Sequence, residues 1–176
     1  MSAKPSGAHP GPVIVMGVSG SGKTTVGRAV AEAFGIPFIE GDSLHPARNV
    51  EKMRQGIPLT DEDRWPWLDS VARELKAQAL ETGGAVVSCS ALRRIYRDRL
   101  RAAVGPGLRF LFLEGDMATL SRRMQHRQGH FMPASLLESQ FATLETPSGE
   151  GDVLAVNVAP PIAEVIAAAI GILNEG

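Results

Sequence analysis

Cysteine and excess charge are what this chain has least of. Its 176 residues include one cysteine, Cys89, so an intramolecular disulfide is excluded. A lone thiol fits a reducing compartment, and we expect a cytoplasmic protein. The formal net charge is −1, which leaves no basic surplus of the kind that binds nucleic acid. We therefore expect no nucleic-acid partner.

Long hydrophobic runs are also missing. The longest apolar stretch, Ile162 to Leu173, is interrupted by Glu164 and is shorter than the ~20 residues that span a bilayer. The first twelve residues, MSAKPSGAHPGP, lack the apolar core of a signal peptide. We expect no membrane association, a flexible leader over 1–12, and a single domain over 13–176, since a domain usually has ~100–200 residues.

One glycine-rich motif is present in full. The segment Gly17–Thr24 reads GVSGSGKT, follows the apolar run Val13–Met16 and leads into a helix-patterned stretch. A polyphosphate needs several converging backbone N–H groups, and glycines let the chain turn tightly enough to present them. A strand before and a helix after the motif disfavour a chance glycine-rich turn.

This loop predicts binding of a nucleoside triphosphate, ATP, with Mg²⁺. Lys23 can reach the β- and γ-phosphates, and the Thr24 hydroxyl is placed to ligate the metal. We expect ATP-binding residues at Gly17, Ser19, Gly20, Ser21, Gly22, Lys23, Thr24 and Thr25. The loop does not say how the phosphate is used, because switches, motors and small-molecule kinases share it.

Further short apolar runs predict an α/β fold with a mostly parallel sheet. They lie at Pro37–Glu40, Ala85–Cys89, Arg109–Leu113 and Val153–Val158, with helix-patterned segments between them. The runs lack polar alternation, as strands buried on both faces do. A closing helix over Ile162–Leu173 carries an apolar stripe that predicts core positions. Another helix is expected to begin with Asp63 as N-cap, which puts Pro66 in its first turn, and to end at Gly83-Gly84.

Ligands of open α/β sheets gather at the carboxyl ends of the strands, and acidic residues follow the second run. Glu40 and Asp42 flank Gly41 and are expected on the same side, close to the terminal phosphate. We predict that Asp42 accepts the proton of an attacking hydroxyl and that Glu40 holds Mg²⁺ through water. A solvated acidic loop is the alternative. The third run ends without a carboxylate, which disfavours motor-type ATPases.

Arginines are concentrated between Arg93 and Arg101. Arg93, Arg97 and Arg101 share a helix face at i, i+4 spacing. A solvated face is the simpler interpretation, and a helix that reaches phosphate or substrate from the end of the third strand is the other.

The segment GDSLHPARNVEKMRQGIPLTDEDRWPWL (41–68) closely resembles the gluconokinases of the thermoresistant type. The resemblance continues through CSALRRIYRDRLR (89–101), LEGD (113–116), Arg123–Phe131 and FATLE (141–145), so it covers nearly the whole chain after residue 12. It implies transfer of phosphate from ATP to the 6-hydroxyl of gluconate. It also implies a fold similar to nucleoside monophosphate kinases and shikimate kinase, with a five-stranded parallel sheet, a mobile lid and usually a homodimer.

A polyol acid needs cations for its carboxylate and polar groups for its hydroxyls. Arg64 is the best candidate for the carboxylate, with Lys52 or Arg48 assisting. Candidates for the hydroxyls are Asp42, His45 and Ser90. His45 alone would be interpreted as a surface histidine, and no neighbours complete a zinc site with it. Trp65 and Trp67 are expected to pack the substrate-side helix.

Residues 123–133 resemble the lid. Arg127 is assigned to the phosphates in catalysis and Arg123 to the phosphates or the adenine face, since arginines that arrive on closure neutralise developing charge. A charged helix end is the alternative. By the same resemblance, the turn that ends at Pro160 borders the adenine.

Other functions stay open at this point. One is a kinase of another small hydroxylated metabolite, although Ser90-Ala91-Leu92 stands where shikimate kinases have a glycine triplet. A nucleotide-dependent switch would need an exposed effector surface, and a polynucleotide kinase a basic, aromatic stripe. Neither pattern is evident in the sequence.

Overall fold

The computed structural model describes residues 9–125 and 134–175. Within them, five parallel strands form one sheet in the order β2-β3-β1-β4-β5. The strands are β1 (Gly11–Met16), β2 (Phe38–Glu40), β3 (Gly84–Ser88), β4 (Arg109–Glu114) and β5 (Val153–Asn157). All five lie at the predicted runs, which confirms the α/β class. β1 begins at Gly11, two residues before the apolar run that predicted it.

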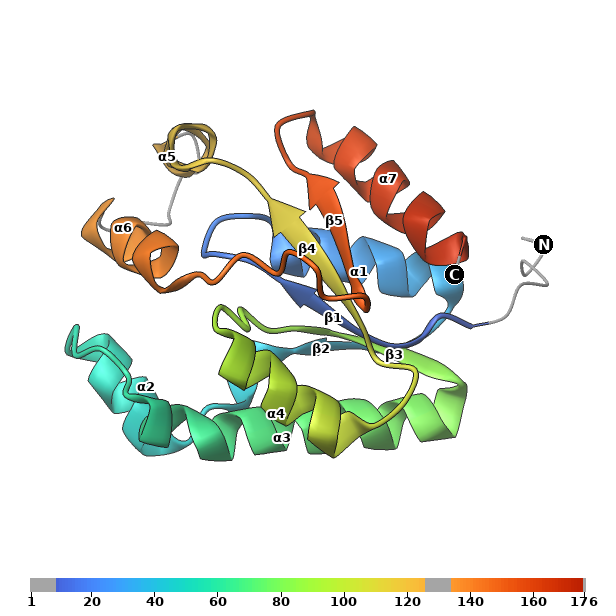
Figure 1. Cartoon of the computed structure of the whole chain (residues 1–176), viewed down its shortest axis with the longest axis horizontal. Coiled ribbons are helices and arrows are strands. Elements are labelled where there is room, and N and C mark those ends of the chain that lie inside the picture. Colours follow the sequence, from blue (N-terminus) through green and yellow to red (C-terminus); the bar gives the residue numbers. More distant parts are fainter. Residues whose placement is uncertain (1–8, 126–133, 176) are drawn as a thin grey trace.

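Helices connect the strands and cover both faces of the sheet (Figure 1). They are α1 (Lys23–Phe34), α2 (Ala47–Arg54), α3 (Asp61–Thr82), α4 (Arg94–Val104), α5 (Met117–Gln125), α6 (Ala134–Thr143) and α7 (Ile162–Asn174), with a 3₁₀ turn, η1, over Gly41–Leu44. None of the helices in the described residues is long and apolar enough to cross a membrane.

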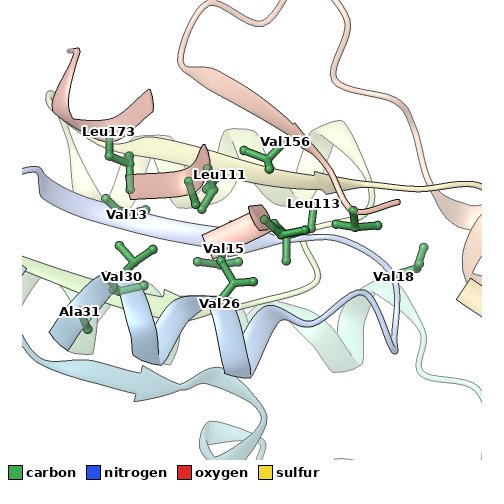
Figure 2. Packing of buried hydrophobic residues seen from close by; sticks show 14 of the residues in the cluster. Val13, Val15, Val18, Val26, Val30, Ala31, Leu111, Leu113, Val156 and Leu173 are labelled. Carbon is green, nitrogen blue, oxygen red and sulfur yellow. The ribbon is translucent and has the colours of Figure 1, made fainter. Parts of the chain in front are cut away.

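The sheet is buried on both faces because the interior positions of its three central strands, β3, β1 and β4, are apolar. In β1, Val13 and Val15 pack into one cluster with α1 and α7, as Figure 2 shows. Ile14 and Met16 pack into a second cluster with α3 and α4. This two-sided burial explains why the strands read as continuous apolar runs.

α3 begins earlier than predicted. Its N-cap is Thr60, whose hydroxyl accepts from the Asp63 N–H while the Asp63 carboxylate accepts from the Thr60 N–H, a capping box. Asp63 is therefore the third residue of the helix, and the prediction of an Asp63 N-cap was wrong. Pro66 consequently lies beyond the first turn, inside the helix. The predicted end is confirmed, since Gly83 caps the helix in a left-handed conformation.

Two arginines of the predicted helix face, Arg97 and Arg101, do not belong to a solvated surface. Arg97 is fully buried and forms an ion pair with Glu150, at 2.8 Å, in the loop before β5. Its other Nη donates to the carbonyls of Ala91 and Leu92. Arg101 pairs with Glu150 and Asp152 at 2.7 Å each. Buried charges need such partners, so these two arginines hold two loops together, and neither a solvated face nor a phosphate-binding helix describes them.

Candidate active site

The carboxyl ends of the strands point to the side of the molecule where α2, α5 and α6 lie (Figure 1). The glycine-rich loop joins the central strand β1 to α1 at this edge. Gly17, Gly20 and Gly22 all have positive φ, which side chains rarely allow, so the glycines of the motif are required by the backbone. The N-terminus of α1 follows Gly22 directly and presents unpaired N–H groups that favour an anion.

Lys23 lies over this loop. Its Nζ donates to the carbonyls of Gly17 and Val18, at 3.0 Å each. Burial lowers the pKa of Lys23, while the nearby charge of Asp42 and, more weakly, that of Glu40 oppose the shift. Lys23, Asp42 and Glu40 are therefore close enough to interact electrostatically. A cation between two carboxylates at a phosphate loop can stabilise charge on a transferred phosphoryl group.

Glu40 connects the phosphate loop to the sheet. One carboxylate oxygen accepts from the Thr24 hydroxyl at 2.7 Å, and the other accepts from the Ser88 hydroxyl at 2.7 Å. Ser88 also accepts from the Gly41 N–H at 3.1 Å. Sequence reasoning assigned no role to Ser88, because a serine that ends a strand carries no signature of this contact.

Thr24 and Glu40 form an oxygen pair that suits a hard cation. Mg²⁺ typically keeps several waters and takes one or two carboxylates together with phosphate oxygens. Within residues 9–125 and 134–175, no group of three or more histidine, cysteine or acidic side chains could form an all-protein metal cage. Among the described residues, the donor set thus fits Mg²⁺ held jointly with phosphates, and not zinc.

Asp42 lies in η1, not in the strand, so its closeness to Glu40 does not come from strand alternation as predicted. The turn forms because Gly41 packs directly against the end of β3. A Cβ at Gly41 would lie 1.8 Å from the carbonyl oxygen of Ser88. Trp67 of α3 also donates from its indole Nε1 to the Gly41 carbonyl at 2.9 Å. These contacts fix the position from which Asp42 leaves the sheet, and Asp42 itself is exposed.

A cavity of about 630 Å³ lies beside the phosphate loop. It is lined by the loop, by α5 and by the turn before α7; its residues include Gly22, Thr25, Arg123, Pro161 and Ile162. Arg123 donates to the Pro160 carbonyl at 2.7 Å. Ile162, predicted as core, is 42 % exposed and belongs to this cavity wall. The remaining positions of the α7 stripe pack inward as predicted.

The cationic side chains predicted to bind the substrate carboxylate fall into two groups. Lys52 and Arg48 both pair with the buried carboxylate of Asp63, at 2.7 and 3.3 Å. Arg64 uses one Nη to donate to the Leu59 carbonyl, at 2.7 Å, and to the Tyr96 hydroxyl, at 3.1 Å. Its remaining nitrogens have no hydrogen-bond partner among the described residues. Arg48 and Lys52 therefore share the charge of Asp63, whereas Arg64 has no charged partner closer than Asp61, at 3.9 Å, among the described residues.

His45 follows η1 and contacts both α3 and α2. Its ring stacks on Trp67 with the centroids 4.1 Å apart, and its Nδ1 is 3.2 Å from the Asn49 amide. Burial lowers the pKa of His45; the charge of Asp42 opposes this shift and that of Arg64 adds to it. His45, Asp42 and Arg64 thus share one electrostatic environment.

Of two further predicted site residues, the structure describes Ser90 and does not describe Arg127. The Ser90 carbonyl accepts from the Gly17 N–H at 3.3 Å, which ties the end of β3 to the phosphate loop. Arg127 lies outside the described residues, as does most of the predicted lid over 123–133.

Sequence reasoning missed one side chain at the phosphate loop. Gln140 of α6 donates to the Ser19 hydroxyl at 2.7 Å, and its carbonyl oxygen accepts from the Ser19 N–H. A glutamine 121 residues away in the chain gives no local signal of such a contact. Two hydrogen bonds between Gln140 and Ser19 therefore connect α6 to the phosphate loop.

Comparisons with known proteins agree with this architecture. A family model described as an AAA domain matches residues 13–147. The thermosensitive gluconokinase of Escherichia coli K12 is 48% identical over 153 residues, which are 86% of this chain and 81% of that protein. A crystal structure of a gluconokinase from Sinorhizobium meliloti 1021 is 54% identical, covers 95% of both chains and has a TM-score of 0.86.

A more distant structure confirms the fold alone. Shikimate kinase from Aquifex aeolicus shares 16% identity and a TM-score of 0.57, over 93% of this chain and 96% of that chain. The predicted likeness to shikimate kinase in fold is thereby confirmed. Because the matches at 48% and 54% identity extend over most of the sequence, the chain belongs to the gluconokinase family of P-loop kinases.

Proposed function

We propose that this protein transfers the γ-phosphoryl group of ATP directly to the 6-hydroxyl of D-gluconate, forming 6-phospho-D-gluconate. The observation that carries the proposal is the convergence of Lys23, Asp42 and Glu40 at the phosphate loop, with His45 and Arg64 in the electrostatic environment of Asp42. A phosphate cradle beside cationic and hydrogen-bonding groups suits a donor nucleotide and a polyol acid. The names of the relatives support the same substrate.

In this mechanism the substrate hydroxyl attacks the γ-phosphorus as its proton passes to the Asp42 carboxylate. A bond forms between the hydroxyl oxygen and phosphorus, the bond to the β,γ-bridging oxygen breaks, and ADP leaves with that electron pair. Lys23 neutralises charge on the β- and γ-phosphates. Mg²⁺ held at Thr24 and, through water, at Glu40 would supply further charge neutralisation of the phosphates.

The nucleotide would occupy the phosphate loop and the adjoining cavity. Arg123 lines that cavity and reaches Pro160, which supports a place for both residues beside the nucleotide. Arg127 belongs to the same proposal as a phosphate ligand of the closed lid, on the resemblance alone. The family resemblance further supports a cytoplasmic homodimer, which size-exclusion chromatography with light scattering would test.

Arg64 is the proposed anchor of the gluconate carboxylate. Lys52 and Arg48 both pair with the carboxylate of Asp63, whereas the Arg64 guanidinium donates to two uncharged groups, the Leu59 carbonyl and the Tyr96 hydroxyl, and lies 3.9 Å from Asp61. A guanidinium binds a carboxylate through two parallel hydrogen bonds, which an ammonium cannot reproduce. Arg64→Lys should therefore raise KM for gluconate by about tenfold or more, in keeping with a lost charge-assisted bond of ~1.5–3 kcal/mol. Equal loss with a neutral polyol substrate would make Arg64 structural.

The deciding experiment is a coupled ADP-release assay over a panel of sugar acids and neutral polyols. Gluconate should give the highest kcat/KM. In the same assay, Asp42→Asn should lower kcat by ~10²–10⁴ with little change in ATP affinity, because the proton acceptor is lost and the phosphate cradle remains. Preference for another metabolite would overturn the substrate assignment, and ATP affinity that fell together with kcat would instead mark Asp42 as a metal-site residue.

A further inference from the structure

Asn49 of α2 is fully buried, and its surroundings determine how its amide is oriented. Its Nδ2 donates to the backbone carbonyl of Asp63 at 2.9 Å and lies 3.2 Å from Nδ1 of His45. A carbonyl oxygen can only accept, so the Asn49 atom that faces it must be the NH₂ group. The inverted amide would set two oxygens against each other in a buried site. Asn49 Oδ1 therefore points the other way, where it has no hydrogen-bond partner among the described residues.

This orientation determines the tautomer of His45. One amide hydrogen of Asn49 is used by the Asp63 carbonyl, and the other points at Nδ1 of His45. Nδ1 must accept this hydrogen and can carry none itself, so the neutral ring holds its proton on Nε2. Protonation of Nδ1 would bring two N–H donors face to face. The stack on Trp67, at 16° between the ring planes, holds the imidazole in the plane that this contact needs.

The charges that face His45 are those of Asp42, from η1, and Arg64, from α3. Burial lowers the pKa of His45, which favours the same neutral ring. Nε2 has no hydrogen-bond partner among the described residues, and the ring shares the electrostatic environment of Asp42 and Arg64. A neutral N–H with no protein acceptor is suited to a ligand oxygen.

We propose that His45 is an obligate hydrogen-bond donor, through Nε2–H, to an oxygen of the polyol-acid substrate, and that Asn49 is the positioning residue that holds this tautomer. This inference rests on the proposed function. His45 then cannot take the proton of the attacking hydroxyl, and that role falls to Asp42 alone. The site also selects its substrate: it accepts an oxygen with a free lone pair, and it disfavours an ammonium or a deoxy carbon at the same position.

The tautomer can be measured without substrate. A two-bond ¹⁵N–¹H spectrum of the full-length enzyme distinguishes protonated from unprotonated ring nitrogens, and the loss of one of the four histidine spin systems in His45→Gln assigns the signal. The wild-type enzyme should show Nε2 protonated and Nδ1 unprotonated. Asn49→Asp should convert His45 to the Nδ1–H form or raise its pKa, because a carboxylate can only accept. An Nδ1–H signal in the folded wild-type enzyme would overturn the proposal, whether or not Asn49→Asp folds.

A matched pair at position 45 tests the donor role. His45→Gln places an amide NH₂ near the position of Nε2, whereas His45→Leu fills similar space with no donor. We expect KM for gluconate to rise by about threefold or less in His45→Gln and by about tenfold in His45→Leu, with the KM for ATP unchanged in both. Equal KM for gluconate in the two variants would refute a donor role. If the wild-type enzyme did not use gluconate at all, the proposed function would fail, and the tautomer measurement would still stand.

Discussion

Gly41→Ala is the sharpest test of how the fold positions the acidic residues. The added Cβ would lie 1.8 Å from the backbone oxygen of Ser88, and real Cβ contacts essentially never fall below 3.0 Å. The two chain segments must therefore separate by about 1.2 Å. Neither can yield cheaply, because the atom that the methyl group meets belongs to the backbone of a buried strand and not to a flexible side chain.

The separation should affect both stability and catalysis. Overpacking a core costs ~1–3 kcal/mol, and a backbone clash belongs at the upper end of that range. At ~2–4 °C per kcal/mol for a protein of this size, Tm should fall by ~6–12 °C. The same shift moves Asp42 and Glu40 away from Lys23, and a displacement of ~1 Å in an active site can lower the rate by ~10²-fold.

Differential scanning calorimetry and steady-state kinetics measure the two effects, and Gly171→Ala is the matched control. Gly171 lies in α7, where a methyl group added to the glycine would meet nothing within 4 Å. There the same change should stabilise the protein by ~0.5–1 kcal/mol, because alanine favours a helix over glycine. If Gly41→Ala had the same Tm and kcat as Gly171→Ala, the close approach of Gly41 to β3 would not be what positions Glu40 and Asp42.

Three further outcomes are expected. Lys23→Ala should lower kcat by ~10²–10³ because a cation at the phosphates is lost, and near-normal turnover would remove Lys23 from the mechanism. Gln140→Leu should lower the unfolding free energy by ~1–3 kcal/mol, the sum for two hydrogen bonds, and speed hydrogen exchange at the Ser19 amide; unchanged exchange would show that α6 does not hold the loop. The hydrogen bond from Lys52, followed by that from the Thr60 N–H, holds the pKa of Asp63 below its ordinary value, so the unfolded chain binds this proton more tightly. The ionised Asp63 carboxylate should therefore add to the free energy of unfolding above pH ~3.9, and this contribution should be lost as the pH falls further. In urea denaturation measured at a series of pH values, Asp63→Asn should reduce the fall in unfolding free energy below pH ~3.9.

The fold was predictable where the signal is local. Continuous apolar runs located all five strands, of which the three central ones are buried on both faces, and the glycine motif located the phosphate loop. The start of α3 was missed because Thr60, Asp61 and Asp63 can all cap a helix, and only the reciprocal bonds identify Thr60. The burial of Arg97 could not be read from helical spacing, since its partner Glu150 is 53 residues away in the chain.

The site was predictable at the strand ends and less so elsewhere. Glu40 and Asp42 stood out because acidic residues stand at the carboxyl end of an apolar run. Asn49 and Gln140 did not, since an amide side chain in a helix resembles a surface residue until its partners are known. Their partners come from α3 and from the loop after β1, which only the folded chain brings near.

The two hydrophobic clusters separate the proposed acceptor-binding segment from the elements that line the nucleotide cavity. The groups proposed to recognise the acceptor substrate come mainly from one uninterrupted stretch, residues 41–68, which holds η1, α2 and the start of α3, a helix that packs on one face of the sheet. Residues of α1, α5 and α7 line the cavity beside the phosphate loop, and the buried side chains of these helices pack on the opposite face of the sheet. Transplanting residues 41–68 from a relative should therefore change which acceptor is phosphorylated and leave nucleotide affinity in place. New acceptor preferences could arise in this family by exchange of a single cassette.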